Sequence, residues 1–209
     1  SPETSRNFKQ IRTDTVQSVR EWGAKAPHFP FPVSHAGPRA GHTGAMSTVL
    51  ESVIADLADE AESLRSILAG LDAHAWSTPT PAEGWNVADQ VAHLVMFDER
   101  CMWGIADPDK FVDDRTAMSG DGVYAAIHDG YASMQPTLLL ARWTEGNDRL
   151  RSAGITADPK ARCMWYGPSM SVVSMLTARL METWAHGWDV CDAVGARMQD
   201  TSRLRHVAH

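Results

Sequence analysis

Cysteine is scarce in this 209-residue sequence, and its few cysteines are spread far apart. Cys101, Cys163 and Cys191 are odd in number and share no short spacing, so they do not form a disulfide framework. Few and unpatterned cysteines are typical of proteins from reducing compartments. We therefore predict a cytoplasmic protein.

Long apolar runs and targeting segments are also missing. No stretch approaches the roughly 20 consecutive apolar residues that a transmembrane helix needs. No stretch combines the n-region and h-region of a signal peptide. With 44% apolar and 22% charged residues, the composition is that of an ordinary globular protein, and we expect no membrane partner.

Basic residues are outnumbered by acidic ones, 19 against 26, and the imbalance lies in one part of the chain. Residues 1–45 hold six Lys and Arg against three Asp and Glu, whereas residues 46–209 hold thirteen against twenty-three. An acidic main body repels the phosphate backbone of DNA and RNA. We therefore expect no nucleic-acid partner.

Strong strand patterns are absent as well, because apolar residues recur at helical spacing. Four segments have this spacing: about Ser47 to Gly70, Asn86 towards Gly104, about 121–143 with a bend at Pro136, and Ser169 or Ser171 to Gly195. Polar, turn-rich connections cover 105–120 and 144–168, and the last residues, 201–209, begin another helix. The predicted fold class is all-α, a four-helix bundle with long connections.

Residues 1–45 do not resemble part of this bundle. Prolines, glycines and alanines make up half of residues 27–44, and such sequence does not form a packed element. We predict a disordered or appended leader over 1–45 and a helical bundle over 46–209. Met46 is a candidate for the natural start.

The candidate functional residues lie on two of the predicted helices. Glu182 and His186 are four residues apart, which places them about 40° from one another on one helix face. A carboxylate and an imidazole in this arrangement can bind one metal ion. His93, in the middle of the second predicted helix, is the candidate third ligand, because two long helices can face each other at the same depth.

Each of these residues also has a structural interpretation. Glu182 with His186 can be a hydrogen-bonded pair, and His93 among apolar neighbours can be a core histidine bonded to a carboxylate. Asp189, on nearly the same face as Glu182, can orient a ligand or be a solvated surface group. Asp89 has a similar claim, although its place in the first helical turn is explained by capping.

Two motifs carry a family resemblance over residues 46–209. Residues 81–94, PAEGWNVADQVAHL, are similar to Pro-Gly-Trp-Ser/Thr-Val-x-Asp-x-x-x-His-Leu, and residues 179–190, RLMETWAHGWDV, are similar to Glu-x-x-x-His-x-x-Asp. Together they resemble the DinB-like superfamily, and within it the mycothiol-dependent maleylpyruvate isomerase N-terminal type. The sequence departs from the pattern after Pro81, where Ala-Glu replaces a short turn. The isomerase's carboxy-terminal domain is expected to be absent or cut off.

The resemblance implies a divalent metal ion, most often zinc, bound by His93, Glu182 and His186. Three protein ligands leave a coordination position for water or substrate. The resemblance also implies mycothiol as a co-substrate, so we expect a small-molecule thiol and an electrophilic substrate as partners. Arg100, Arg162 and Arg179 are the candidates for binding the polar groups of the thiol.

Three functions fit these ligands. The first is a metal- and thiol-dependent transferase or isomerase that acts on small electrophiles. The second is a metal-binding helical module without catalysis, and the third is a hydrolase that uses zinc-bound water. The sequence leaves the catalytic residues and the oligomeric state open, a dimer included.

Overall fold

The computed structural model describes residues 43–118, 122–158, 161–199 and 201–206. The predicted leader lies outside these residues except for 43–45, which belong to the first described helix. The α-helices of the described residues are α2 (Thr43–Ala69), α3 (Val87–Ala106), α4 (Pro108–Ala117), α5 (Val123–Ala132), α6 (Pro136–Thr156) and α7 (Val172–Val194). The 3-10 helices are η1 (Ala75–Ser77) and η2 (Ser202–His206), and two short strands are β1 (Arg162–Cys163) and β2 (Met170–Ser171).

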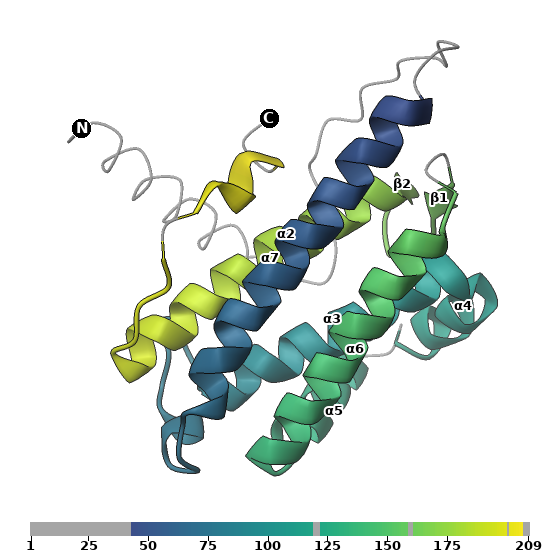
Figure 1. Cartoon of the computed structure of the whole chain (residues 1–209). Helices are drawn as coiled ribbons and strands as arrows, with labels where there is room; N and C mark the ends of the chain where they lie inside the picture. The colour runs from purple at the N-terminus through teal and green to yellow at the C-terminus, as the bar shows by residue number, and fades with distance from the viewer. Residues whose placement is uncertain (1–42, 119–121, 159–160, 200, 207–209) are drawn as a thin grey trace. The chain divides into compact units, whose positions relative to one another are not determined.

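The predicted helical bundle is confirmed, and its long helices are α2, α3, α6 and α7 (Figure 1). Helix α2 packs against α7 and α6, while α3 packs against α6, α5 and α7. Helix α3 is therefore in contact with α7, the helix that carries the predicted Glu–His pair. This contact brings residues about 90 positions apart in the sequence into one site.

The third predicted helix is wrong in its bounds. The segment 121–143 contains the whole of α5, which ends at Ala132, and the beginning of α6, which starts at Pro136. Proline fits the first turn of a helix as well as a bend, since the amide hydrogen that it lacks has no partner in the first turn. Helix α6 then extends to Thr156, through much of the connection predicted over 144–168, and α4 occupies much of 105–120.

The helices that carry the candidate site begin and end where local signals predict. Asn86 accepts a hydrogen bond from the Asp89 amide, and the Asp89 carboxylate accepts one from the Asn86 amide, which completes a capping box at α3. Ser171 caps α7, and Gly195 ends it with φ of 69°, in the left-handed region. These caps fix the start of α3 and both ends of α7.

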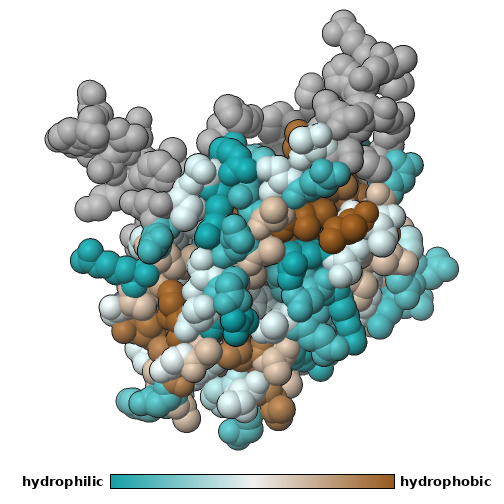
Figure 2. Space-filling view, viewed as in Figure 1, coloured by the Kyte–Doolittle hydropathy of each residue, from teal (hydrophilic) through white to brown (hydrophobic). Residues whose placement is uncertain are grey.

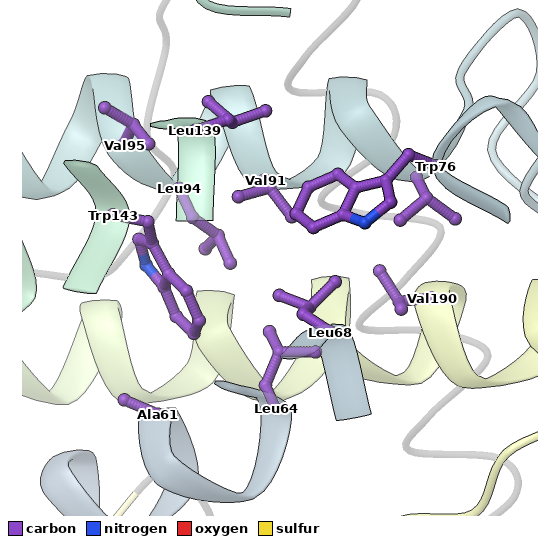
Figure 3. Packing of buried hydrophobic residues seen from close by; sticks show 11 residues of the cluster. Ala61, Leu64, Leu68, Trp76, Val91, Leu94, Val95, Leu139, Trp143 and Val190 are labelled. Carbon is purple, nitrogen blue, oxygen red and sulfur yellow. The ribbon is translucent and has the colours of Figure 1, made fainter. Parts of the chain in front are cut away.

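The hydrophobic core lies where α2, α3, α6 and α7 meet (Figure 3). Its members include Leu64 and Leu68 of α2, Val91 and Leu94 of α3, and Trp143 of α6. Each buried side chain of this size contributes about 1.5–3 kcal/mol to stability when it leaves water. The core therefore holds α3 and α7 in a fixed relation, which is what a site shared by the two helices requires.

The face of the molecule in Figure 2 is largely hydrophilic, with separate apolar patches. Among the described residues, the large apolar side chains that are well exposed are Val49, Leu138 and Ile155. Within the same residues, no helix combines the length and the hydropathy needed to cross a membrane.

The β1–β2 hairpin is joined to α3 through a close approach at Gly104. The Met164 amide donates a hydrogen bond to the Gly104 carbonyl at 3.3 Å. A Cβ atom at Gly104 would lie 2.4 Å from the Met164 carbonyl oxygen, a backbone atom that cannot rotate away. Glycine at this position therefore allows the segment after β1 to lie against α3.

Gly104→Ala is expected to lower the free energy of unfolding by about 1–3 kcal/mol, because the added methyl group forces two backbone segments apart. Urea denaturation followed by circular dichroism measures this change. Gly130→Ala is the matched control: no atom lies within 4 Å of a Cβ there, and alanine favours the helix by up to about 1 kcal/mol. Equal effects of the two substitutions would contradict a close approach at Gly104.

Candidate metal centre

The structure brings the three predicted ligands together between α3 and α7. The Glu182 Oε2 atom lies 3.2 Å from His186 Nε2 and 3.5 Å from His93 Nε2. One ligand atom from each residue lies within 4.8 Å of the others, and all three residues are buried. Their role as metal ligands stays a prediction. Helical spacing accounts for the nearness of Glu182 and His186, and the packing of α3 on α7 brings His93 to them.

The donor set fits a zinc-like divalent cation. With metal–ligand bonds of about 2.0–2.1 Å in a tetrahedron, the ligand atoms stand about 3.3 Å apart. The two distances at Glu182 Oε2, 3.2 Å and 3.5 Å, are close to this edge length. Two imidazoles and one carboxylate are also the ligand types of several catalytic zinc sites, in which a fourth position is open.

The protonation states of the site suit a cation as well. Burial, reinforced by the nearby His186 ring, lowers the pKa of His93 to about 3, so this imidazole is neutral at pH 7. Burial alone would raise the pKa of Glu182, but the two neighbouring imidazoles and the charge of Arg179 outweigh it, and the net shift is downward. A neutral imidazole and a carboxylate are the forms that bind metal ions.

Gln90 lies one turn before His93 on α3 and contacts Nδ1 of His186, the ring nitrogen that does not face Glu182. Gln90 was not among the predicted site residues. The Gln90 Oε1 atom forms a short hydrogen bond with His186 Nδ1. Gln90 Nε2 donates to Thr80 Oγ1 at 2.8 Å and to Asp189 Oδ2 at 3.4 Å. Asp189, predicted to orient a ligand or to be solvated, is buried and reaches His186 through Gln90. The i, i+3 spacing of Gln90 and His93 was the available signal.

Aromatic rings enclose the site. Trp85, at the end of the loop before α3, lies with its ring centroid 5.9 Å from that of His186 in a nearly parallel orientation, and 5.4 Å from that of His93. Phe97, one turn after His93 on α3, lies 4.6 Å from the His93 ring. These rings surround the ligands with apolar surface, which strengthens electrostatic interactions inside the site.

Residues 57–191 match the profile of the Mycothiol maleylpyruvate isomerase N-terminal domain. This match covers well over half of the chain. The chain belongs to this family.

Relatives of two kinds accompany the family match. Two uncharacterized proteins from different strains of Mycobacterium tuberculosis are 39% identical over 158 residues, which is 75% of this chain and 62% of each relative. The chain therefore spans less than two thirds of the length of these curated relatives. Two crystal structures of the mycothiol-dependent maleylpyruvate isomerase also align with this chain, over 76% of its length and 68% of theirs. The structure of a histidine-to-alanine mutant has a TM-score of 0.61 at 15% identity, and the other structure has a TM-score of 0.59 at 17% identity. That similarity shows a shared fold.

The three arginines that we predicted to bind the thiol lie in different surroundings in this member of the isomerase N-terminal family. Arg179 is buried, and its Nε donates to Asp98 Oδ1 at 2.8 Å. Arg100 is buried and paired with Asp114 at 2.8 Å. Arg162 is exposed and bonded to Ser169 within the hairpin. Their role in binding a thiol stays a prediction.

Proposed function

We propose that this chain is a metal-dependent enzyme of the maleylpyruvate isomerase type, which uses a low-molecular-weight thiol to act on small electrophiles. The observation that carries the proposal is the arrangement of His93 and His186 around one Glu182 oxygen in a buried, aromatic-lined site. A divalent cation bound there would supply an open coordination position that lowers the pKa of a thiol or water. Direct metal analysis of the purified protein is expected to identify this cation as zinc.

The thiol in this proposal comes from outside the chain. Cys101, Cys163 and Cys191 are all buried. Burial raises the pKa of Cys163 to about 11 and that of Cys101 further still, so neither is a ready thiolate at pH 7. The nucleophile in this proposal is therefore an external thiol such as mycothiol, which is in the name of the family.

Arg179 is the best placed of the predicted thiol- or substrate-binding arginines. Its guanidinium carbon lies 6.0 Å from the centroid of Phe97, the ring that packs against His93. Among the described residues its Nη2 atom has no hydrogen-bond partner, although it is buried. A carboxylate of the thiol or the substrate would satisfy this donor, because guanidinium groups bind carboxylates well. Arg100 and Arg162 remain proposed contacts for more distant groups.

The residues around the ligands have separate proposed tasks. Trp85 and Phe97 keep bulk water from the site, so that a thiolate is not shielded from the electrophile. Glu182 and the two histidines set the charge of the ligand set at minus one. That charge moderates the pull of a divalent cation on a bound thiolate and keeps the thiolate nucleophilic.

Thermal melting of the zinc-loaded protein, with and without mycothiol, tests the proposal. A thiol at about ten times its Kd should stabilise the protein by about 1.4 kcal/mol, or about 3–6 °C for a chain of this size. The same thiol should change the visible spectrum of a cobalt-substituted sample. Glu182→Gln keeps the helix propensity but should weaken metal binding and turnover together.

The results of these measurements distinguish the three functions that fit the predicted ligands. A thiol-dependent shift in melting and spectrum supports the thiol-dependent enzyme. Hydrolysis of test esters or amides without any thiol effect would favour zinc-bound water as the nucleophile. Metal binding with neither effect would contradict the proposed enzyme and leave a non-catalytic metal-binding module.

A further inference from the structure

We propose that Gln90 is a positioning residue: its amide selects which nitrogen of His186 faces the metal position and ties that choice to the loop that carries Trp85. This inference rests on the proposed metal site. It concerns one side chain that contacts three partners: His186 and Asp189 on α7, and Thr80 in the loop before α3.

The donors and acceptors around Gln90 can be assigned from their chemistry. The Asp189 carboxylate only accepts hydrogen bonds, so the amide nitrogen of Gln90 must be the group that faces it, at 3.4 Å. The amide oxygen then faces His186 Nδ1 and only accepts. His186 must therefore carry a proton on Nδ1, and in its neutral form its Nε2 atom is a bare lone pair.

The bare Nε2 atom points at a second acceptor. It lies 3.2 Å from Glu182 Oε2, and two acceptors at that distance repel unless a proton or a cation lies between them. Asp189, acting through Gln90, thus keeps the neutral ring in the tautomer that a metal ion requires. Carboxylate or carbonyl groups that hold the far nitrogen of a metal-binding histidine have the same effect in other proteins.

The same amide also holds the loop over the site. Gln90 Nε2 donates to Thr80 Oγ1 at 2.8 Å, and the Thr80 hydroxyl donates to the Trp85 carbonyl at 3.0 Å. The Thr80 amide donates to the same carbonyl at 2.8 Å. The Trp85 ring lies nearly parallel to His186, at an interplanar angle of 12°. Rotation of the Gln90 amide would therefore disturb both the proposed ligand His186 and the Trp85 ring that stacks on it.

Zinc affinity, measured by chelator competition on folded protein at 25 °C, tests the positioning role. Gln90→Leu should weaken zinc binding about 10–100-fold, the usual cost of losing an outer partner of a ligand. It should also alter the cobalt spectrum. Thr183→Val is the matched control: Thr183 is buried and follows Glu182 in sequence, and its hydroxyl donates to the Arg179 carbonyl of the same helix at 2.8 Å. Its zinc affinity should stay within about twofold of wild type, as no partner of a ligand is lost.

Asp189→Asn tests whether Asp189 acts on His186 through Gln90. The single variant also provides a test if Gln90→Leu fails to fold. In wild type it should weaken zinc binding about 3–10-fold, because an amide at 189 no longer dictates the orientation of Gln90. In the Gln90→Leu background most of this loss should disappear. An equal loss in both backgrounds would mean that Asp189 affects the metal without Gln90, and the proposed action through Gln90 would be wrong.

Hydrogen exchange of residues 79–85 tests the link to the loop. Zinc should increase protection of this segment in wild type and much less in Gln90→Leu, and an equal increase in both would overturn the link. The two proposals fail differently. Wild-type protein that binds no zinc would contradict the metal site itself, whereas tight wild-type binding with an unchanged Kd in Gln90→Leu would contradict only the positioning role.

Discussion

His93→Ala and His186→Ala are each expected to abolish stoichiometric zinc binding. Structural zinc sites with four protein ligands bind with about 10–16 kcal/mol, so one ligand is worth on the order of 10²–10³-fold in affinity. Both histidines lie within 3.5 Å of the shared Glu182 oxygen, and the cluster offers no fourth protein ligand among the described residues. The measurement is metal content after dialysis, with Kd from chelator competition.

His128→Ala is the matched control for these two variants. His128 is also a buried imidazole, and its ring lies 5.0 Å from that of Trp85, but its Nε2 atom is bonded to the Asp89 carbonyl. Its removal changes the packing around Trp85 without removing a proposed ligand. A full metal complement in both His93→Ala and His186→Ala would show that the site assignment is wrong, as would a loss in His128→Ala of the same size.

Asp98→Ala is expected to be the most destabilising single change outside the ligands. Asp98 is fully buried on α3 and accepts hydrogen bonds from Arg179 Nε at 2.8 Å, Asn147 Nδ2 at 3.1 Å and Trp143 Nε1 at 3.2 Å. Its removal leaves the buried Arg179 guanidinium without its hydrogen-bonded counter-ion, which typically costs about 3–5 kcal/mol. Urea denaturation of the metal-free protein should show a midpoint shift of corresponding size.

Two further variants separate this ion pair from general damage. Asp98→Leu combined with Arg179→Met removes both charges, and such apolar replacements of a buried pair are often neutral, so much of the stability should return. Glu145, whose side chain is 63% exposed, pairs with Arg149 on the surface. Glu145→Ala should therefore change the urea midpoint far less. A double variant no more stable than Asp98→Ala would mean that the buried charge is not the cause.

The sequence by itself determined the parts of this protein that depend on neighbours along the chain. The capping signals at Asn86 and Gly195 predicted the start of α3 and the end of α7, and Ser171 was one of two predicted caps at the start of α7. The stacking of Glu182 and His186 followed from helical geometry alone, because residues four apart share a face. The division between α5 and α6 was missed for the same local reason, since Pro136 fits a first turn as well as a bend.

Only the tertiary structure decided which distant groups meet. That His93 faces Glu182 depends on how α3 and α7 are rotated and at what depth they pack, and no local pattern fixes either quantity. The contact of Gln90 with His186, 96 positions away, arises from the same packing. Arg179 pairs with Asp98 because the core places α7 beside α3. Side-chain contacts between helices depend on the whole packed core, and for that reason the site is completed only in the folded chain.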